Sequence, residues 1–240
     1  MKHLSWHSCC QTLTGTKRPE NQDSYCELEK MGLWMIADGM GGHHGGEFAS
    51  HTVADAFADY ELKASIDDAV ADCHQRLQTA NSKILLQRAE ANQMMGTTAI
   101  VLLFHGTSWV CLWAGDSRCY QLSDGKLHLL TRDHNLLQDA IARGQNESSV
   151  DPRKAGHITR AVGASDQLVV DQTSGSIHSG DLFLVCSDGL NKAVSDSVIE
   201  QALNSYSGSD AASRLIEFSK AKNTRDDITF AIVDVAASTP

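Results

Sequence analysis

The order of its short apolar runs constrains the fold of this chain more than any other sequence feature. Runs rich in β-branched and aromatic residues are typical of β-strands, and here they recur at residues 4–13, 23–28, 32–37, 97–104, 108–114, 118–122, 127–130, 167–173, 181–186 and 228–235. Turn residues bound most of them, as Ser-Asp-Gly does at 123–125. Helical spacing of apolar residues instead predicts helices over 46–60, 65–90 and 209–221, and a short one around 196–204.

This order favours antiparallel sheets over a doubly wound parallel sheet. In a parallel sheet strands alternate with helices, whereas here neighbouring strands are joined by short turns and the two longest predicted helices are consecutive. We therefore expect an α+β fold in which antiparallel β-sheets pack against pairs of α-helices. No internal repeat, low-complexity tract or linker-like segment divides the 240 residues, so we expect one domain over residues 1–240.

Charge and composition argue against nucleic acid as a partner. Thirty acidic residues against 20 basic ones give a formal net charge of −10, and a protein that binds a phosphate backbone needs the opposite sign. Aromatic residues make up only 6% of the chain, so little is available to stack on bases. An acidic protein that handles phosphate must therefore gather its cations locally.

Cysteine usage and the length of the apolar runs predict a cytoplasmic protein without a membrane segment. The seven cysteines are odd in number and form no Cys-x-x-Cys pair, which argues against a disulfide scaffold. The N-terminal segment MKHLSWHSCCQTL lacks the long apolar core of a signal peptide. Residues 91–115 carry no formal charge, but a polar turn splits their apolar runs, and each run is too short to span ~30 Å of hydrocarbon. We interpret this segment as a β-hairpin.

Aspartates at the ends of apolar strands form the candidate functional site. Asp38, Asp116 and Asp188 each follow an apolar run beside a glycine, and Asp226 and Asp227 come directly before the run ITFAIV. A single Asp-Gly pair is more often a turn, but four sites of one form indicate that their side chains converge. Gathered carboxylates repel one another, and a divalent cation relieves that repulsion. Oxygen ligands suit Mg²⁺ or Mn²⁺, and the sequence has no His/Cys cluster with the spacing of zinc ligands.

Eight motifs, in order along the chain, resemble those of one known family. They are GTKRPENQDS (15–24), ADGMGGHHGGEFAS (37–50), GTT (96–98), GDSR (115–118), TRDH (131–134), ITRAVG (158–163), GDLFLVCSDGL (180–190) and TRDDIT (224–229). Together they resemble the bacterial metal-dependent serine/threonine phosphatases of the protein phosphatase 2C family. The resemblance implies a sandwich of two antiparallel β-sheets flanked by pairs of α-helices, with a metal centre at one end.

The resemblance also implies a set of metal ligands. Asp38 is expected to bridge two Mn²⁺ or Mg²⁺ ions, and the carbonyl of Gly39 is expected to bind one of them. Asp188 and Asp226 are expected to complete the ligands of the first ion. A third, weaker ion is expected between Asp116 and Asp188.

Further residues receive roles from the same resemblance. Asp23 is expected to hold the waters around the metals, and Arg18 to bind the substrate phosphate with its guanidinium fork. His43 is the nearest candidate for contact with the substrate or its leaving group, and the alternative is an ordinary loop residue. For Asp116 the alternative is a hydrogen bond only to Arg118 or within its own turn.

The activity implied is hydrolysis of phosphoserine and phosphothreonine in proteins by a metal-activated water. No protein nucleophile is required, and the seven cysteines include no Cys-x5-Arg phosphate loop. The substrate would be a phosphorylated protein, either a cognate serine/threonine kinase or one of its targets, with type VI secretion control as the pathway suggested by analogy. The alternatives are an inactive phosphatase-like binding module and a regulatory phosphatase of an anti-sigma system.

Overall fold

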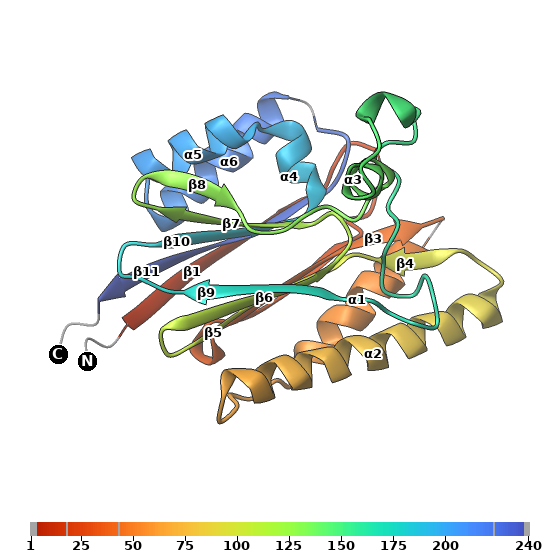
Figure 1. The fold of residues 1–240 in the computed structure, drawn as a ribbon, viewed down its shortest axis with the longest axis horizontal. Helices are drawn as coiled ribbons and strands as arrows, with labels where there is room; N and C mark the ends of the chain where they lie inside the picture. Colours follow the sequence, from red (N-terminus) through yellow and green to blue (C-terminus); the bar gives the residue numbers. More distant parts are fainter. Residues whose placement is uncertain (1–3, 18, 43, 223, 238–240) are drawn as a thin grey trace.

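Two antiparallel β-sheets stacked face to face form the centre of the computed structural model, which describes residues 4–17, 19–42, 44–222 and 224–237 (Figure 1). The five-stranded sheet has the order β1 (Leu4–Leu13), β11 (Ile228–Ala237), β10 (Leu182–Cys186), β7 (Arg118–Ser123), β8 (Lys126–Leu129). The other has the order β2 (Asp23–Leu28), β3 (Leu33–Gly41), β5 (Ala99–His105), β6 (Ser108–Ala114), β9 (Asp171–Ser176), with β4 (Met95–Thr97) beside the end of β3.

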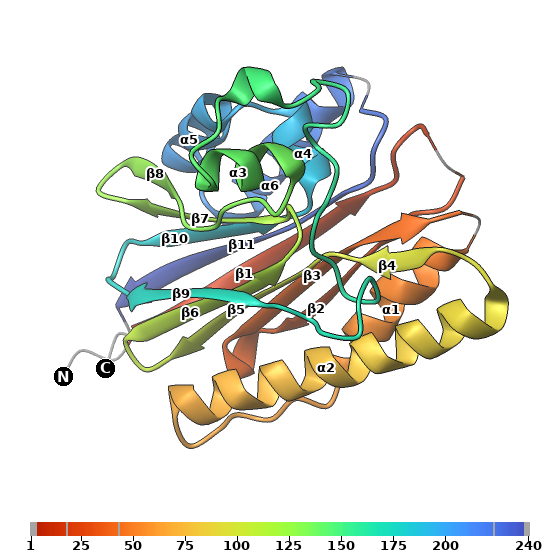
Figure 2. The ribbon, with the colours of Figure 1, turned by 45° about the vertical axis from the view of Figure 1, so that its right-hand side comes forward.

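Helices cover the outer face of each sheet. The six-stranded sheet carries α1 (Gly45–Phe57) and α2 (Ile66–Ala91), and the five-stranded sheet carries α4 (Asp188–Ala193), α5 (Asp196–Ser205) and α6 (Gly208–Ala221) (Figures 1 and 2). The crossing between β8 and β9 contains α3 (Leu136–Ala142) and the short 3₁₀ helix Glu147–Ser149; a second 3₁₀ helix, Glu29–Met31, follows β2.

The continuous apolar strands arise because each sheet is buried on both faces. In β5, Val101 and Leu103 pack toward α1 and α2, whereas the alternate residues Ile100 and Leu102 pack between the sheets. Successive side chains of a strand point to opposite faces, so a strand in this position is apolar at every residue. Phe104 lies at the centre of the layer between the sheets, in edge-to-face contact with neighbouring aromatic rings.

The predicted α+β sandwich is confirmed, and its local differences from the prediction include one shifted strand and two short helices. The strand predicted over 167–173 lies at Asp171–Ser176, since its pairing with β6 fixes the register. Helices α3 and α4 were not predicted, because each is too short for apolar periodicity to show. The hairpin predicted within 91–115 is confirmed as β5 and β6, and the described residues include no helix long and apolar enough to cross a membrane.

Candidate metal centre

The antiparallel order brings the predicted aspartates to one end of the sandwich. Asp23 begins β2 and lies directly opposite Asp38, near the end of β3, in the strand register. Asp188 is the first residue of α4, immediately after β10, and Asp226 lies just before β11, the neighbour of β10. Asp116 occupies the turn from β6 to β7, and β7 pairs with β10 on its other side. The two sheets thus contribute carboxylates from both sides to the same end.

The proton affinity of Asp38 shows that these carboxylates act on one another. Withdrawal of its carboxyl from water, and then the charges of the other four aspartates, raise the pKa of Asp38 well above its usual range; the four are Asp23, Asp188, Asp116 and Asp226. Burial likewise raises the pKa of Asp116 to about 7, and the charge of Asp188 adds to that shift. The predicted convergence of Asp38, Asp116, Asp188 and Asp226 is therefore present in the structure, with Asp23 beside them.

Burial and hydrogen bonding have opposite effects on the pKa of Asp23. Burial raises the pKa of Asp23 to about 7, although hydrogen bonds from Ser187 and Thr229 oppose the shift. The hydroxyl of Ser187 donates to Asp23 Oδ2 at 2.8 Å and itself accepts the backbone N–H of Thr229 at 2.9 Å. One oxygen of Asp23 is thus fixed by the β10–β11 side of the sandwich, and the other remains available.

The unpaired oxygens of the cluster fit a divalent cation. Within the described part of the chain, one buried carboxylate oxygen of each of Asp23, Asp116 and Asp188 has no hydrogen-bond partner. A buried polar atom without a partner is costly, and gathered carboxylates add mutual repulsion. The ammonium of Lys192 contacts Asp188 and lies 3.2 Å from Asp226, so it neutralises part of the negative charge of the cluster. The donors are all oxygen, which suits Mn²⁺ or Mg²⁺.

Close backbone packing explains the glycine at position 39. A Cβ at Gly39 would lie 2.2 Å from the carbonyl oxygen of Gly46 and 2.5 Å from that of Gln22, so no side chain fits there. The N–H of Gly39 donates to the carbonyl of Gln22 at 3.0 Å. The predicted ligand Gly39 is therefore held by backbone contacts from two flanking segments.

Thr98 fixes the other side of Asp38. Its hydroxyl accepts the backbone N–H of Asp38 at 2.9 Å and lies 2.8 Å from the hydroxyl of Ser117, next to Asp116. The GTT motif was noted in the sequence, but no role was predicted for this hydroxyl. Thr98 is fully buried between β4 and β5, so its hydroxyl is a structural contact to the centre.

Asp227 has a role that the sequence analysis did not predict. Its carboxylate accepts the backbone N–H of Gly15 and that of Gln22, each at 2.8 Å. It therefore holds both ends of the loop of residues 15–22 against the start of β11. The doubled aspartate in TRDDIT was the available signal: one member faces the cluster, and its neighbour faces the loop.

The alternative for Asp116 was a hydrogen bond only to Arg118 or within its own turn. Arg118 is not its partner, whereas a hydrogen bond to its own backbone opposes the rise in the pKa of Asp116. Arg118 donates two hydrogen bonds to the carboxylate of Asp133, at 2.9 and 2.8 Å. The oxygen Oδ1 of Asp116 is buried without a hydrogen-bond partner among the described residues. Asp116 therefore faces the carboxylate cluster, whereas Arg118 binds Asp133 in the segment of residues 131–134.

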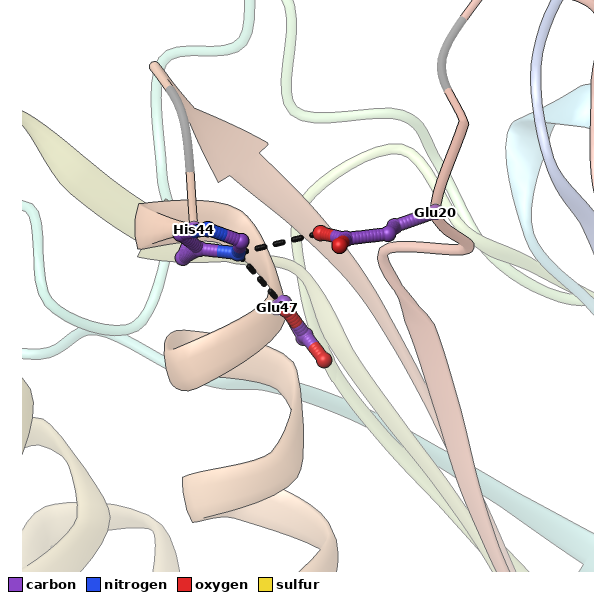
Figure 3. Close-up of side chains that lie close together, drawn as sticks. All are labelled: Glu20, His44 and Glu47. Atoms are coloured by element: carbon purple, nitrogen blue, oxygen red, sulfur yellow. Dashed lines mark hydrogen bonds and ion pairs between the residues drawn. The ribbon is translucent and has the colours of Figure 1, made fainter.

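Two predicted site residues, Arg18 and His43, lie outside the described residues. Their neighbours form a surface cluster that was not predicted, shown in Figure 3: Nδ1 of His44 lies 3.0 Å from Glu20 and 3.3 Å from Glu47. The hydrogen bond to Glu47 and the charge of Glu20 raise the pKa of His44. We interpret the contacts as ion pairs that join the 15–22 loop to the first turn of α1, although the three donor atoms are also close enough to share an ion.

Comparison with known proteins places this geometry in a family. The family model described as Protein phosphatase 2C matches residues 16–225. The serine/threonine protein phosphatase PstP of Mycobacterium tuberculosis is 33% identical over 226 residues, which are 92% of this chain; the match spans only 43% of PstP. The protein phosphatase PhpP of Streptococcus pneumoniae is 32% identical over 236 residues, covering 93% of this chain and 95% of PhpP.

Solved structures agree in fold. PppA, a key regulatory component of the type VI secretion system in Pseudomonas aeruginosa, superimposes with a TM-score of 0.89 at 31% identity, covering 96% of this chain and 98% of PppA. The catalytic domain of PstP in complex with two manganese ions has a TM-score of 0.85 at 32% identity and covers 97% of this chain and 99% of that one. By sequence and by fold, this chain belongs to the protein phosphatase 2C family.

Proposed function

We propose that this chain is a metal-dependent protein phosphatase that hydrolyses phosphoserine and phosphothreonine esters. The observation that supports this most is the position of five aspartates at one end of the sandwich, where Asp23 lies opposite Asp38 in the strand register and Lys192 contacts both Asp188 and Asp226. Three of these carboxylates, those of Asp23, Asp116 and Asp188, are buried, which destabilises the fold, and binding of catalytic metal ions accounts for their presence where an inactive binding module would not. Membership of a phosphatase family supports the same choice.

The metal ligands are proposed residue by residue. The carboxylates of Asp38, Asp188 and Asp226 and the backbone carbonyl of Gly39 would hold two divalent ions. The two manganese ions of the PstP catalytic domain support this number. When bound, such ions lower the pKa of water and neutralise the charge that develops on phosphate. Asp116 and Asp188, whose charges act directly on each other, are proposed to hold a third ion more weakly.

The remaining proposed roles belong to the protein itself. Asp23 has one oxygen fixed by Ser187 and one unpaired oxygen among the described residues, and this second oxygen is proposed to orient water beside the ions. Burial raises the pKa of Asp23 to about 7 in the metal-free chain, and a divalent cation beside it would stabilise the charged carboxylate, which is the form that accepts hydrogen bonds from water. Arg18 is proposed to bind two phosphate oxygens, and His43 to contact the leaving group; both roles rest on the family motifs.

The proposed substrate is a phosphorylated protein, either a cognate serine/threonine kinase or one of its targets. Similarity to PppA supports control of a type VI secretion system as its setting. The seven free thiols support a reducing compartment, and we propose the cytoplasm. In a strain that lacks the protein, secretion-system proteins are expected to gain threonine phosphorylation, as measured by phosphoproteomics; an unchanged pattern would remove this pathway.

One assay tests the activity and its metal requirement. The purified chain is incubated with p-nitrophenyl phosphate and with a phosphothreonine peptide, in Mn²⁺ or Mg²⁺ and after exhaustive chelation. We expect turnover of both substrates with metal, and recovery after Mn²⁺ is added back to the chelated protein. Asp38→Asn should lose turnover, whereas Asp67→Asn, an exposed aspartate at the start of α2, should retain it. Full activity without metal would contradict the proposal.

A further inference from the structure

A cationic pocket opens beside the carboxylate cluster. It has a volume of about 510 Å³ and is lined by Lys192, Ala193, Lys222, Thr224, Arg225 and Asp226. Asp226 belongs both to this pocket and to the cluster, so the two are contiguous. Half of the lining residues are cations, although the whole chain has a formal net charge of −10. The pocket is therefore a positively charged region next to the carboxylate cluster, on a chain whose net charge is negative.

Two separate segments line the pocket: the end of α4, and the connection from the end of α6 to β11. Lys192 comes from α4, Lys222 from the end of α6, and Arg225 from the connection that leads into β11. The start of the loop that follows β1 runs along this connection (Figure 2): Thr16 N–H donates to Thr224 O at 3.2 Å, and Lys17 N–H donates to Arg225 O at 2.9 Å. The exposed residue Lys17 therefore lies beside the same pocket and adds to its positive surroundings.

The charges of the pocket are unequally neutralised. Lys192 pairs with Asp188 and Asp226, and these contacts raise its pKa against the opposing effect of burial. Lys222 and Arg225 are exposed, and within the described part of the chain no carboxylate lies at ion-pair distance from either. A pocket with two such cations next to a cluster of anions is suited to a ligand with a negative charge.

From this arrangement, and resting on the phosphatase function proposed above, we propose that the pocket binds an acidic side chain of the substrate protein close in sequence to the phosphorylated residue. An extended peptide advances by about 3.3 Å per residue, so a glutamate or aspartate one to three positions away can reach a pocket that shares Asp226 with the cluster. The enzyme would then prefer phosphothreonine flanked by acidic residues and disfavour phosphothreonine flanked by lysine.

The test compares three phosphothreonine peptides that differ only at the two positions on either side of the phosphorylated residue. These positions hold Glu, Gln or Lys, and p-nitrophenyl phosphate serves as the substrate without flanking residues. For the wild-type chain with Mn²⁺ we expect kcat/KM about five- to twentyfold higher for the Glu peptide than for the Gln peptide, the sum of a few partly exposed charge pairs. The difference should lie in KM and shrink as salt is raised from 50 to 500 mM (about 14 to 4 Å of screening length).

Charge reversal supplies the decisive comparison. The double variant Lys222→Glu/Arg225→Glu should lose the preference for the Glu peptide and favour the Lys peptide, a gain that a damaged enzyme would not show. The matched control Lys83→Glu/Lys126→Glu changes two exposed lysines on α2 and β8 and the net charge by the same amount. It should keep the wild-type preference. Circular dichroism checks that both variants fold, and Lys222→Gln/Arg225→Gln replaces the reversal variant should it not fold.

The outcomes separate this inference from the proposed function. Wild-type protein that hydrolyses the peptides but does not distinguish Glu from Gln overturns the pocket's role. Equal loss of preference in the charge-reversal variant and in the control also overturns it, since the general charge of the protein would then be responsible. Wild-type protein that turns over none of the peptides and no p-nitrophenyl phosphate in Mn²⁺ overturns the phosphatase function itself.

Discussion

At the scale of single residues, the raised proton affinities of Asp23 and Asp116 predict how stability depends on pH. Both have a pKa of about 7 in the folded chain against 3.8 as the ordinary value. Between these pH values the folded state holds protons that the unfolded state has released. Each group therefore lowers the free energy of unfolding as pH rises from about 4 to 7, by at most about 1.4 kcal/mol per pH unit.

We expect the melting temperature of the chelated protein to fall between pH 5 and pH 8, and Mn²⁺ to raise it more at pH 8 than at pH 5. Differential scanning calorimetry with and without metal measures both effects. Asp23→Asn removes one titrating group and should flatten the pH dependence of the chelated protein. Stabilisation by Mn²⁺ that is the same at every pH would show that these carboxylates do not take part in binding.

Substitution of Asp188 tests the first ion's ligands. Asn keeps the shape of the side chain but removes the charge that acts on Asp38 and Asp116. For Asp188→Asn we expect kcat to fall on the order of 10²-fold or more, since each ion contributes several kcal/mol to the stabilisation of charge. Steady-state kinetics at saturating Mn²⁺ measures this, with Asp67→Asn as the control. Wild-type kcat in Asp188→Asn would remove it from the proposed ligands.

For substitution of Asp116 we expect a different result, because the two core ions are proposed to have other ligands. Asp116→Ala should retain two tightly bound Mn²⁺ and a normal fold, but lose most turnover on a phosphopeptide. Its activity should also depend less steeply on Mn²⁺ in the millimolar range, since few protein oxygens remain for a third ion. Isothermal titration calorimetry and metal-dependent kinetics measure the two effects. Unchanged turnover and metal dependence would leave Asp116 without a role at the metals.

At the scale of elements, one buried histidine joins the β8–β9 crossing to the turn that carries Asp116. His134 is fully buried and stacks on Trp113. Its Nδ1 accepts the N–H of Gly115 at 3.2 Å, while its backbone N–H donates to Gly115 O at 2.9 Å. Burial lowers the pKa of His134, and the proton of the neutral ring is then on Nε2, 3.2 Å from Asp171.

His134→Ala should therefore damage both stability and the site. It leaves the N–H of Gly115 without its ring acceptor and opens a void beside Trp113, so we expect a loss of about 2–4 kcal/mol in the free energy of unfolding. Urea unfolding measures this, and the exposed residue His128 on β8 provides the control, His128→Ala. The Mn²⁺ dependence of the remaining activity should resemble that of Asp116→Ala. A variant as stable as His128→Ala would show that the contact is dispensable.

The same elements show where sequence analysis succeeds and where it stops. The apolar run of β5 is predictable because both of its faces are buried, whatever its partners are. The strand β9 is not: its residues Asp171–Ser176 are polar, and only the hydrogen bonds with β6 make them a strand. Helix α4 has six residues and follows β10 without a loop, so its sequence resembles a strand followed by a turn.

At the scale of the whole molecule, the sequence predicted which aspartates converge but not how they are held. Strand-end positions were enough to place Asp38, Asp116, Asp188 and Asp226 together. The contacts of Asp227 to Gly15 and of Ser187 to Asp23 join segments more than 150 residues apart, and no local pattern encodes such pairs. The cationic pocket escaped prediction for the same reason, because Lys192 lies 30 residues before Lys222 in the sequence.

The paired strands β1 and β11 also separate the carboxylate cluster from the end of the sandwich where another protein could be attached. It pairs Leu13 with Ile228 at the end beside the aspartates and Leu4 with Ala237 at the other, where Figure 1 places both termini. Ten residues at about 3.4 Å each put roughly 30 Å between these ends. A fluorescent protein joined before Leu4 or after Ala237 should therefore leave kcat/KM for a phosphopeptide within about twofold of the untagged value. Such a tag could tether the enzyme to a surface, a bead or another domain while its opposite end stays open to large phosphorylated proteins.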